Sequence, residues 1–160
     1  ELVMEPGNPS VLYASTWTVI RTPYSLESGG KGSALWKSTD GGGTWKKLNN
    51  TKGFPGNTVI GNIGIAVSAV NPKRVFALVE SKKGGLFRSD DGGDSWELVS
   101  TEPEIRQRAW YFSKIYSDPK NEDIVYGLNV NMYRSSDGGK TLKEINKNNI
   151  TRVLSEYFIF

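Results

Sequence analysis

Residues 89–96 read SDDGGDSW, and this stretch occurs in three related copies along the chain. The other copies are STDGGGTW at residues 38–45 and SSDGGKTL at residues 135–142. Their shared aspartates are Asp40, Asp91 and Asp137, so the intervals between copies are 51 and 46 residues. A repeat of roughly 40–50 residues is the length of one propeller blade. The repeated box therefore predicts a propeller-like architecture.

Each box lies within a longer repeated phrase that predicts four short strands. An Asn-Pro or Asp-Pro pair begins a turn at Asn8, Asn71 and Asp118. A run of β-branched and aromatic residues follows each pair, as expected of a strand, and two further short strands flank the box. A fourth strand precedes the turn in the second and third units. The first unit has only residues 2–4 in that place, so we expect it to lack most of its first strand.

The predicted fold class is all-β, a partial β-propeller of about three four-stranded antiparallel blades joined by box hairpins. The blades are expected at about residues 1–50, 57–100 and 108–145, which makes residues 1–145 a partial propeller. Propellers close with four to eight blades. We therefore expect remaining blades of the same propeller, or self-association, to cover the open flanks. Residues 146–160 form a divergent tail that fits a short helix, a stray strand or the end of a truncated reading frame.

The residue types of the box suit a tight hairpin. Glycine adopts positive φ without strain, the Asp carboxylate accepts hydrogen bonds from the N–H groups after it, and the hydroxyl groups add further bonds. We expect Trp45 and Trp96 to bury a large apolar face across their turns, whereas Leu142 is smaller and makes the third hairpin the weakest. The structural box residues are predicted to be Ser38, Asp40, Gly42, Trp45, Ser89, Asp91, Gly93, Trp96, Ser135, Asp137 and Gly139.

Calcium binding is the alternative interpretation of the boxes, because Asp90, Asp91, Asp94 and Glu97 lie close together in the sequence. Calcium loops of the EF-hand type place acids or amides at alternate positions and glycine at the sixth. No box has that spacing. We therefore predict structural turns, with no bound metal and no cofactor.

The composition excludes several classes of chemistry. The 160-residue chain contains no cysteine and no histidine, which rules out disulfides, zinc sites built on those residues and a Ser-His-Asp triad. Its net charge of +3 comes from scattered basic residues, so no nucleic-acid partner is expected. No apolar run approaches the ~20 residues of a membrane span, so no membrane insertion is expected. The first residues have neither a basic start nor a long apolar core, so no signal peptide is expected in this segment.

Three segments do not repeat, namely residues 17–32, 51–62 and 101–111. Long loops on a rigid scaffold are where binding residues concentrate. Aromatic and cationic side chains in them suit stacking on sugars or clamping carboxylates. The competing interpretation is that the tryptophans pack within blades and the arginines pair with local acids. The binding candidates are Trp17, Arg21, Tyr24, Arg106, Arg108, Trp110 and Tyr111.

Glu80 is the single weak candidate for catalysis. It ends the second strand of its unit, where the other units carry no acid. A glycosidase needs two carboxylates roughly 5–9.5 Å apart, and no second acid stands out, because Glu27, Glu102 and Glu104 are loop residues without further support. The Arg-Ile-Pro signature of sialidases is also absent. Whether the chain is an enzyme is therefore open, with the balance against catalysis by this chain alone.

The box resembles the Asp-box, or BNR repeat, whose pattern is Ser-x-Asp-x-Gly-x-Thr-Trp. Proteins with this repeat include sialidases, xyloglucanase-like glycoside hydrolases and the sortilin/VPS10 propeller, and the resemblance covers about residues 6–145. Bacterial secreted proteins of the sortilin-like or glycosyl-hydrolase-like kind are the most similar, with a phrase like residues 105–111 opening a blade. The resemblance implies an extracellular or periplasmic location.

The resemblance implies a fold more strongly than an activity, because the same box serves enzymes and binders. The leading hypothesis is a non-catalytic segment of a sortilin-like propeller that presents loops to a protein, peptide or glycan. The alternative is a fragment of a xyloglucanase-like hydrolase of β-glucans, in which Glu80 works with an acid from another blade. A third hypothesis is an assembly factor that resembles the propellers which help to build photosynthetic complexes.

Overall fold

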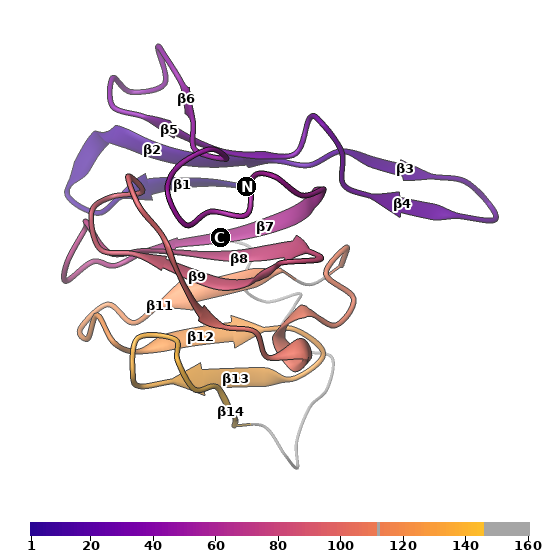
Figure 1. Ribbon diagram of the computed structural model, residues 1–160. Coiled ribbons are helices and arrows are strands. Elements are labelled where there is room, and N and C mark those ends of the chain that lie inside the picture. Colours follow the sequence, from indigo (N-terminus) through magenta and orange to yellow (C-terminus); the bar gives the residue numbers. More distant parts are fainter. Residues whose placement is uncertain (112, 146–160) are drawn as a thin grey trace.

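The computed structural model describes residues 1–111 and 113–145. They form three four-stranded antiparallel sheets, stacked one after another as blades 1, 2 and 3 (Figure 1). Blade 1 consists of β1 (Leu2–Glu5), β2 (Asn8–Thr16), β5 (Ala34–Ser38) and β6 (Lys46–Lys47). Blade 2 consists of β7 (Ile60–Val67), β8 (Val75–Ser81), β9 (Gly85–Ser89) and β10 (Glu97–Ser100). Blade 3 consists of β11 (Lys114–Ser117), β12 (Val125–Leu128), β13 (Met132–Ser135) and β14 (Lys143–Glu144).

The strands of each blade pair in chain order, so the predicted all-β partial propeller is confirmed. The expectation that the first unit lacks most of its first strand is wrong. Strand β1 has 4 residues, as many as β11, and it pairs antiparallel with β2. Four residues suffice because the longer β2 supplies the hydrogen-bonding partner. The predicted tail at residues 146–160 lies outside the described residues.

Two smaller elements complete the described chain. Strands β3 (Val19–Arg21) and β4 (Leu26–Ser28) pair as a separate hairpin inserted between β2 and β5. A short 3₁₀ helix, η1 (Pro103–Arg106), lies between blades 2 and 3. Among the described residues, no helix has the length and apolarity needed to cross a membrane.

The box hairpins are held by one set of hydrogen bonds. In the second box, Ser89 Oγ donates to Asp91 Oδ1 at 2.7 Å and accepts from the Gly93 N–H at 2.7 Å. The N–H of Ser95 donates to Asp91 Oδ1 at 2.8 Å. The first and third boxes repeat these bonds. Both box glycines have positive φ, +72° and +94° in the second copy, where residues with a Cβ would be strained.

These bonds lower the pKa of the box aspartates. Hydrogen bonds from the Thr44 N–H and hydroxyl bring the pKa of Asp40 to about 2. Burial raises the pKa of Asp91 and Asp137, but the hydrogen bonds from Ser95 and Thr141 outweigh it and lower the pKa of each to about 2. Hydrogen bonds to a carboxylate favour its charged form. The box aspartates are therefore ionised at neutral pH.

Replacing Ser89 with alanine is expected to cost about 1–3 kcal/mol of unfolding free energy. The Ser89 side chain is buried, and its loss leaves the buried Gly93 N–H without its acceptor. Urea denaturation measures the change. The matched control is Ser136→Ala, because Ser136 is an exposed residue of the third box and should be within about 0.5 kcal/mol of wild type. Equal losses in the two variants would contradict the prediction.

The hydrophobic core lies between blades and forms two clusters. The first junction joins blades 1 and 2 and contains Tyr13, Leu35 and Leu48 of blade 1 against β7, β8 and β9. The second junction joins blades 2 and 3 and contains Phe76 and Leu86 of blade 2 against Ile115, Val125 and Tyr133 of blade 3. Each blade is thus stabilised mainly by its neighbours.

The two box tryptophans differ in burial. Trp96 is 6 % exposed and packs edge-on against Phe54, with ring centroids 5.4 Å apart. Trp45 is 38 % exposed, so the expectation that it buries a large apolar face is wrong. Its indole N–H still donates to Gly42 O at 3.0 Å. The difference arises because blade 1 covers the second box, whereas no described residues cover the first.

The register of the strands places the boxes and the non-repeated segments at opposite edges. In blade 2, Val75 pairs with Ser89 of the box, whereas Ile60 pairs with Ser81 at the other end. We call the side of the molecule formed by the strand ends opposite the boxes the loop edge, and the other side the box edge. The β3–β4 hairpin and η1 both lie at this edge (Figure 1). The segment at residues 51–62 reaches it where β7 begins.

Candidate functional site

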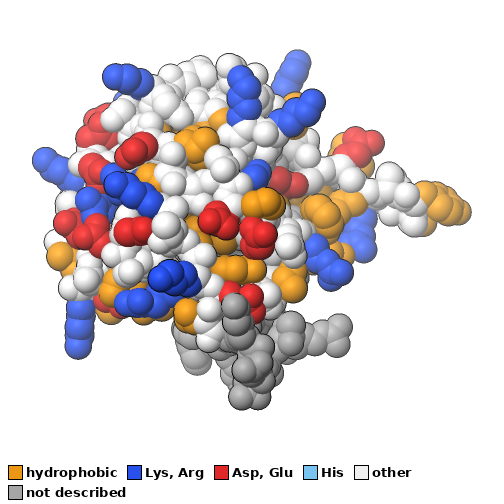
Figure 2. Space-filling view, turned by 60° about the horizontal axis from the view of Figure 1, so that its bottom comes forward, with side chains coloured by type: hydrophobic (Ala, Val, Ile, Leu, Met, Phe, Trp, Pro, Cys, Tyr) orange, Lys and Arg blue, Asp and Glu red, His pale blue; other side chains and the backbone are white. Residues whose placement is uncertain are grey.

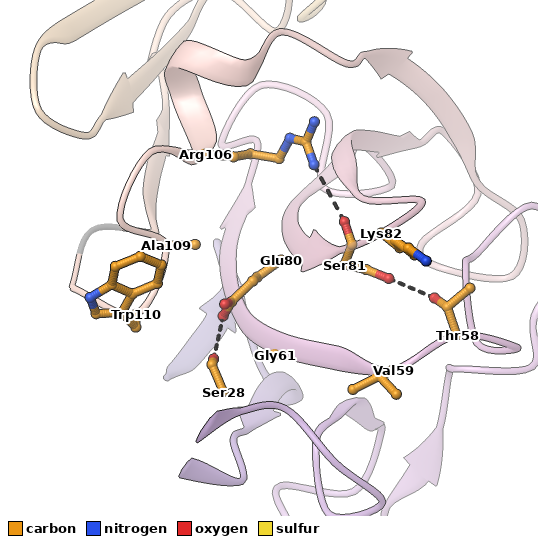
Figure 3. A pocket seen from close by; sticks show the side chains of 10 residues that line it. All are labelled: Ser28, Thr58, Val59, Gly61, Glu80, Ser81, Lys82, Arg106, Ala109 and Trp110. Carbon is orange, nitrogen blue, oxygen red and sulfur yellow. Dashed lines mark hydrogen bonds between the residues drawn. The ribbon is translucent and has the colours of Figure 1, made fainter. Parts of the chain in front are cut away.

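A pocket of about 550 Å³ lies at the loop edge, where blade 2 meets the non-repeated segments (Figure 3). We call it the Glu80 pocket. The strand end at residues 80–82 contributes three of its lining residues, and all three non-repeated segments contribute others. The lining residues are Ser28, Thr58, Val59, Gly61, Glu80, Ser81, Lys82, Arg106, Ala109 and Trp110.

Glu80 is held in the pocket by two donors. Its Oε2 accepts hydrogen bonds from Ser28 Oγ and from the Asn62 N–H, each at 2.7 Å. Ser28 Oγ in turn accepts from the indole N–H of Trp17 at 3.0 Å. A side chain at Gly61 would collide with the Glu80 carboxylate. This relay fixes the Glu80 side chain toward Ser28 (Figure 3). Trp17 acts by positioning Ser28.

Arg106 joins η1 to the end of blade 2. One guanidinium NH₂ group donates to Ser81 O at 3.4 Å and the other to Thr101 O at 3.1 Å. Its Nε is buried without a hydrogen-bond partner, and no carboxylate of the described residues forms an ion pair with it. Arg106 therefore orders the loop and leaves its positive charge unneutralised beside the pocket.

A rim of aromatic and cationic groups adjoins the pocket. Trp110 lines the pocket and is 38 % exposed. Its ring centroid lies 6.4 Å from that of Tyr111. Arg21 donates from Nη1 to the Tyr111 hydroxyl at 2.8 Å, and its guanidinium carbon lies 5.9 Å from the Tyr111 ring centroid. The hairpin and the third non-repeated segment thus meet at this rim, which also offers exposed aromatic surface.

The seven predicted binding residues are only partly brought together. Arg106 and Trp110 line the pocket, Arg21 and Tyr111 form the rim beside it, and Trp17 contacts the pocket through Ser28. Tyr24 stands apart at the turn of the β3–β4 hairpin and is 98 % exposed. That hairpin projects from the molecule, with hydrophobic side chains at its tip (Figure 2).

Arg108 is also exposed, and it does not line the pocket. Its φ of +51° makes it the one non-glycine residue with positive φ among those described. Its carbonyl accepts from the Tyr111 N–H at 2.8 Å, which closes the turn that presents Trp110. Its backbone thus shapes this turn.

Sequence reasoning missed several polar residues that line the pocket or hold its lining residues. Ser28 and Asn62 hold Glu80, and Asn62 Nδ2 also donates to Ala109 O at 3.0 Å. Thr58 Oγ1 and Ser81 Oγ are hydrogen-bonded at 2.6 Å. Their position in the sequence is what could have indicated these residues, because Ser28, Thr58 and Asn62 lie inside the non-repeated segments. Their residue types alone do not distinguish them from ordinary turn residues.

The pocket can bind a polar ligand but holds one carboxylate among its described lining residues. Glu80 is accompanied by two cations, Lys82 and Arg106. Hydroxyl groups of Thr58 and Ser81 and the face of Trp110 complete the polar and aromatic surface. No group of three or more acidic residues in the described part of the chain could hold a metal ion. This arrangement suits recognition of an anionic or sugar-like group more than two-carboxylate hydrolysis.

Comparison with known proteins identifies relatives of two kinds. The Sortilin-Vps10 family model, described as sortilin, neurotensin receptor 3, matches residues 33–154. The human VPS10 domain-containing receptor SorCS3 is 30 % identical over 112 residues, which cover 68 % of this chain. A probable oligoxyloglucan-reducing end-specific xyloglucanase of Neosartorya fischeri is 24 % identical over 149 residues. The chain spans 8 % of the receptor's length and 17 % of the xyloglucanase's.

Solved structures share the fold. A GH74 xyloglucanase from Xanthomonas campestris superposes with a TM-score of 0.58 at 19 % identity, covering 86 % of this chain and 21 % of the enzyme. YCF48 from Cyanidioschyzon merolae superposes with a TM-score of 0.57 at 18 % identity, covering 96 % of this chain and 38 % of YCF48. YCF48 has also been solved bound to a D1 peptide. At these identities the structural similarity concerns the fold alone.

Proposed function

Because this chain belongs to the Sortilin-Vps10 family, we propose that it is a non-catalytic propeller segment that binds a protein or peptide at the Glu80 pocket. The main support for this proposal is that all three non-repeated segments contribute residues to one pocket at the loop edge. The box edge acts as a scaffold, because the polar side chains of the boxes are hydrogen-bonded within their own turns. The loop edge has the exposed aromatic and cationic groups that recognition requires.

The charges in the pocket favour a ligand that brings a carboxylate. Lys82 is exposed, and Arg106 has no ion-pair partner among the described residues. Trp110 provides a flat apolar wall on the side of the pocket opposite Lys82 (Figure 3). Tryptophan and arginine are the residue types that most often dominate binding energy at protein interfaces. The YCF48 structure bound to a D1 peptide supports the same use of a related propeller.

A glycan-hydrolysing role is the second candidate, and Glu80 favours it. Its carboxylate faces the same pocket as Trp110, an arrangement suited to a stacked sugar. The xyloglucanase relatives make this chemistry plausible for the family. Hydrolysis needs a second carboxylate on the other side of the scissile bond. We propose that, in this case, another blade supplies it.

Binding is tested with an array of synthetic peptides of graded net charge, each with a free carboxyl terminus. The affinity of the tightest array peptide is then measured by fluorescence anisotropy. Trp110→Ala is expected to weaken binding by about 2 kcal/mol, or ~30-fold in Kd. Lys82→Ala is expected to weaken it less and to reduce its salt dependence, because Lys82 is exposed.

The matched control is Lys120→Ala, because Lys120 is exposed in the Pro turn of blade 3 at the box edge. It should leave the affinity unchanged. The proposal is contradicted if no array peptide binds wild type more tightly than Trp110→Ala. Release of reducing sugar from xyloglucan oligosaccharides by wild type, abolished in Glu80→Gln, would instead support the hydrolase.

The location and the extent of the binding unit are also proposals. We propose a site outside the cytoplasm, either extracellular or periplasmic, because the relatives include a receptor and polysaccharide hydrolases. We propose residues 1–145 as the propeller part, which contains every described strand.

A further inference from the structure

The Glu80 pocket holds charges of opposite sign that do not pair with one another. Glu80, Lys82 and Arg106 all line it. Among the described residues, no ion pair includes any of the three. Glu80 and Arg106 are also half-buried, where a charge without a counter-charge is less stable than in water. Departures from the usual pairing of charges are expected at functional sites.

The Glu80 carboxylate is held in place without being neutralised. Its two hydrogen bonds, from Ser28 Oγ and from the Asn62 N–H, both fall on Oε2. A carboxylate accepts hydrogen bonds at both of its oxygens, and no hydrogen bond from a described residue occupies Oε1. Both donors are neutral groups. They therefore orient the side chain and leave its negative charge for a ligand.

Trp110 lies on the same side of the pocket as the Glu80 carboxylate, and we call this the Glu80 side (Figure 3). Asn62 links the two residues, because its N–H donates to Glu80 and its Nδ2 donates to Ala109 O, next to Trp110 in the chain. An aromatic ring attracts a cation to its face, and a carboxylate attracts a cation by its charge. Both groups of the Glu80 side therefore suit an ammonium group.

Lys82 lies on the opposite side of the pocket, which we call the Lys82 side (Figure 3). The Arg106 guanidinium is held on this side, because it donates to the carbonyl of Ser81, the residue before Lys82. Its second hydrogen bond is to Thr101 O. Both acceptors are neutral carbonyls, so they fix the guanidinium without balancing its charge. The Lys82 side therefore suits a carboxylate.

We propose that the peptide bound at the Glu80 pocket carries an ammonium group and a carboxylate together. The ammonium group lies against Glu80 and Trp110, and the carboxylate lies against Lys82 and Arg106. This inference rests on the proposed function and specifies the charge pattern of its ligand. A peptide with a carboxylate alone leaves the Glu80 charge unbalanced, whereas one with both charges balances both sides of the pocket. The ammonium group comes from a lysine side chain or from the amino terminus of the peptide.

The test uses synthetic peptides with both ends blocked, in which one lysine and one aspartate are separated by different numbers of glycine residues. Each peptide has two partner peptides, one with acetyl-lysine in place of lysine and one with asparagine in place of aspartate. Fluorescence anisotropy measures the Kd of each peptide. At the best spacing, the charged peptide should bind the wild type at least about 10-fold more tightly than either partner, because each partner lacks one of the two charges.

A second set of peptides without lysine distinguishes the two sources of the ammonium group. These peptides keep the aspartate and have either a free or an acetylated amino terminus. Tighter binding of the free form assigns the ammonium group to the amino terminus of the ligand. A preference confined to the lysine peptides assigns it to a side chain. Either preference supports the proposal, because both present an ammonium group to Glu80.

Glu80→Gln tests whether Glu80 is the residue that recognises the ammonium group. Glutamine keeps an oxygen that accepts from Ser28 and from the Asn62 N–H, but it has no charge. The preference for the ammonium-bearing peptide should therefore fall to about 2-fold or less. The matched control is Glu27→Gln, because Glu27 is an exposed acid of β4 that does not line the pocket. It should keep the wild-type preference, and circular dichroism checks that both variants are folded.

The outcomes separate this inference from the proposed function. Suppose that carboxylate peptides bind the wild type and that Trp110→Ala weakens them, but that blocking the ammonium group leaves Kd unchanged. The binding role then stands and this inference is overturned. A folded Glu80→Gln that keeps the full preference also overturns it. If no peptide of any set binds the wild type, the inference and the proposed function both fail. The comparison of peptides on the wild type does not depend on the folding of any variant.

Discussion

Replacing Phe76 with alanine is expected to lower the free energy of unfolding by about 3–5 kcal/mol. Phe76 is 0 % exposed and lies in the second junction with Ile115 and Val125 of blade 3. Its truncation leaves a cavity where two hydrogen-bonded sheets meet, and neither sheet can collapse into it without losing its own register. Urea denaturation, followed by tryptophan fluorescence, measures the loss as a lower midpoint at unchanged slope.

The matched control for Phe76→Ala is Tyr24→Ala. It removes an aromatic ring of similar size from the turn of the β3–β4 hairpin, where Tyr24 is 98 % exposed. A change within about 0.5 kcal/mol is expected there, because no contact or cavity is involved. A loss below about 1 kcal/mol in Phe76→Ala would contradict the conclusion that the junctions carry the stability of the fold.

Blade 2 differs from blades 1 and 3 because it contributes residues to both hydrophobic clusters. Phe87 faces the first junction, whereas Phe76 and Leu86 face the second. In repeat proteins, stability is approximately the sum of repeat terms and nearest-neighbour interface terms. Truncations in blade 2 should therefore weaken one or the other of the two described junctions, whereas those in blade 1 or blade 3 reach a single described junction.

The three boxes made the architecture predictable from the sequence. Their hydrogen bonds are local, so the residues that form each hairpin are adjacent in the chain and visible as a pattern. The turns that begin at Asn71 and Asp118 were visible for the same reason, whereas the turn predicted at Asn8 is wrong, because Asn8 and Pro9 begin strand β2. The structure adds that the second and third boxes also bond the Pro turn of their own blade, since the N–H groups of Gly92 and Gly138 donate to Lys73 O at 2.8 Å and Asp123 O at 2.9 Å.

Features that depend on distant residues could not be predicted in this way. Trp45 and Trp96 stand at the same position of two similar boxes, but their exposure differs because blade 1 covers the second box, whereas no described residues cover the first. The length of strand β1 was underestimated, because this strand forms by pairing with β2 and its own composition gives little indication of it. The β3–β4 hairpin was visible only as an insertion of unknown conformation.

The candidate site was predicted only in part, by setting aside the residues of the repeat and considering the segments that remain. Removing the repeat pointed to three segments, and all three reach the Glu80 pocket. The sequence did not show that Arg106 binds two carbonyls, or that Trp17 reaches Glu80 through Ser28. These contacts join residues from separate segments, so no local pattern records them. The assignment of ligand contacts within the site stays a prediction.

Acid should unfold this protein through its boxes. The pKa of Asp40, Asp91 and Asp137 is lowered from 3.8 to about 2 in each case. A group whose pKa is lower in the folded state stabilises the fold fully above its unfolded pKa. That stability is lost as the pH falls from about 4 toward about 2, because protons then bind the unfolded chain more tightly. The free energy of unfolding should therefore fall steeply across this window.

Asp91→Asn tests whether the three box aspartates cause this acid sensitivity. The free energy of unfolding of this variant is measured by urea denaturation at a series of pH values. Asparagine does not titrate, so one proton fewer should be taken up on unfolding and the slope against pH should decrease by about one third. The control is Asp94→Asn, because Asp94 forms an exposed ion pair with Lys46, with both side chains 64 % accessible. Such pairs contribute little, so the control should keep the wild-type slope. An unchanged slope in Asp91→Asn would show that the protons bind elsewhere, and the hydrogen bonds of the box would then not account for the acid sensitivity.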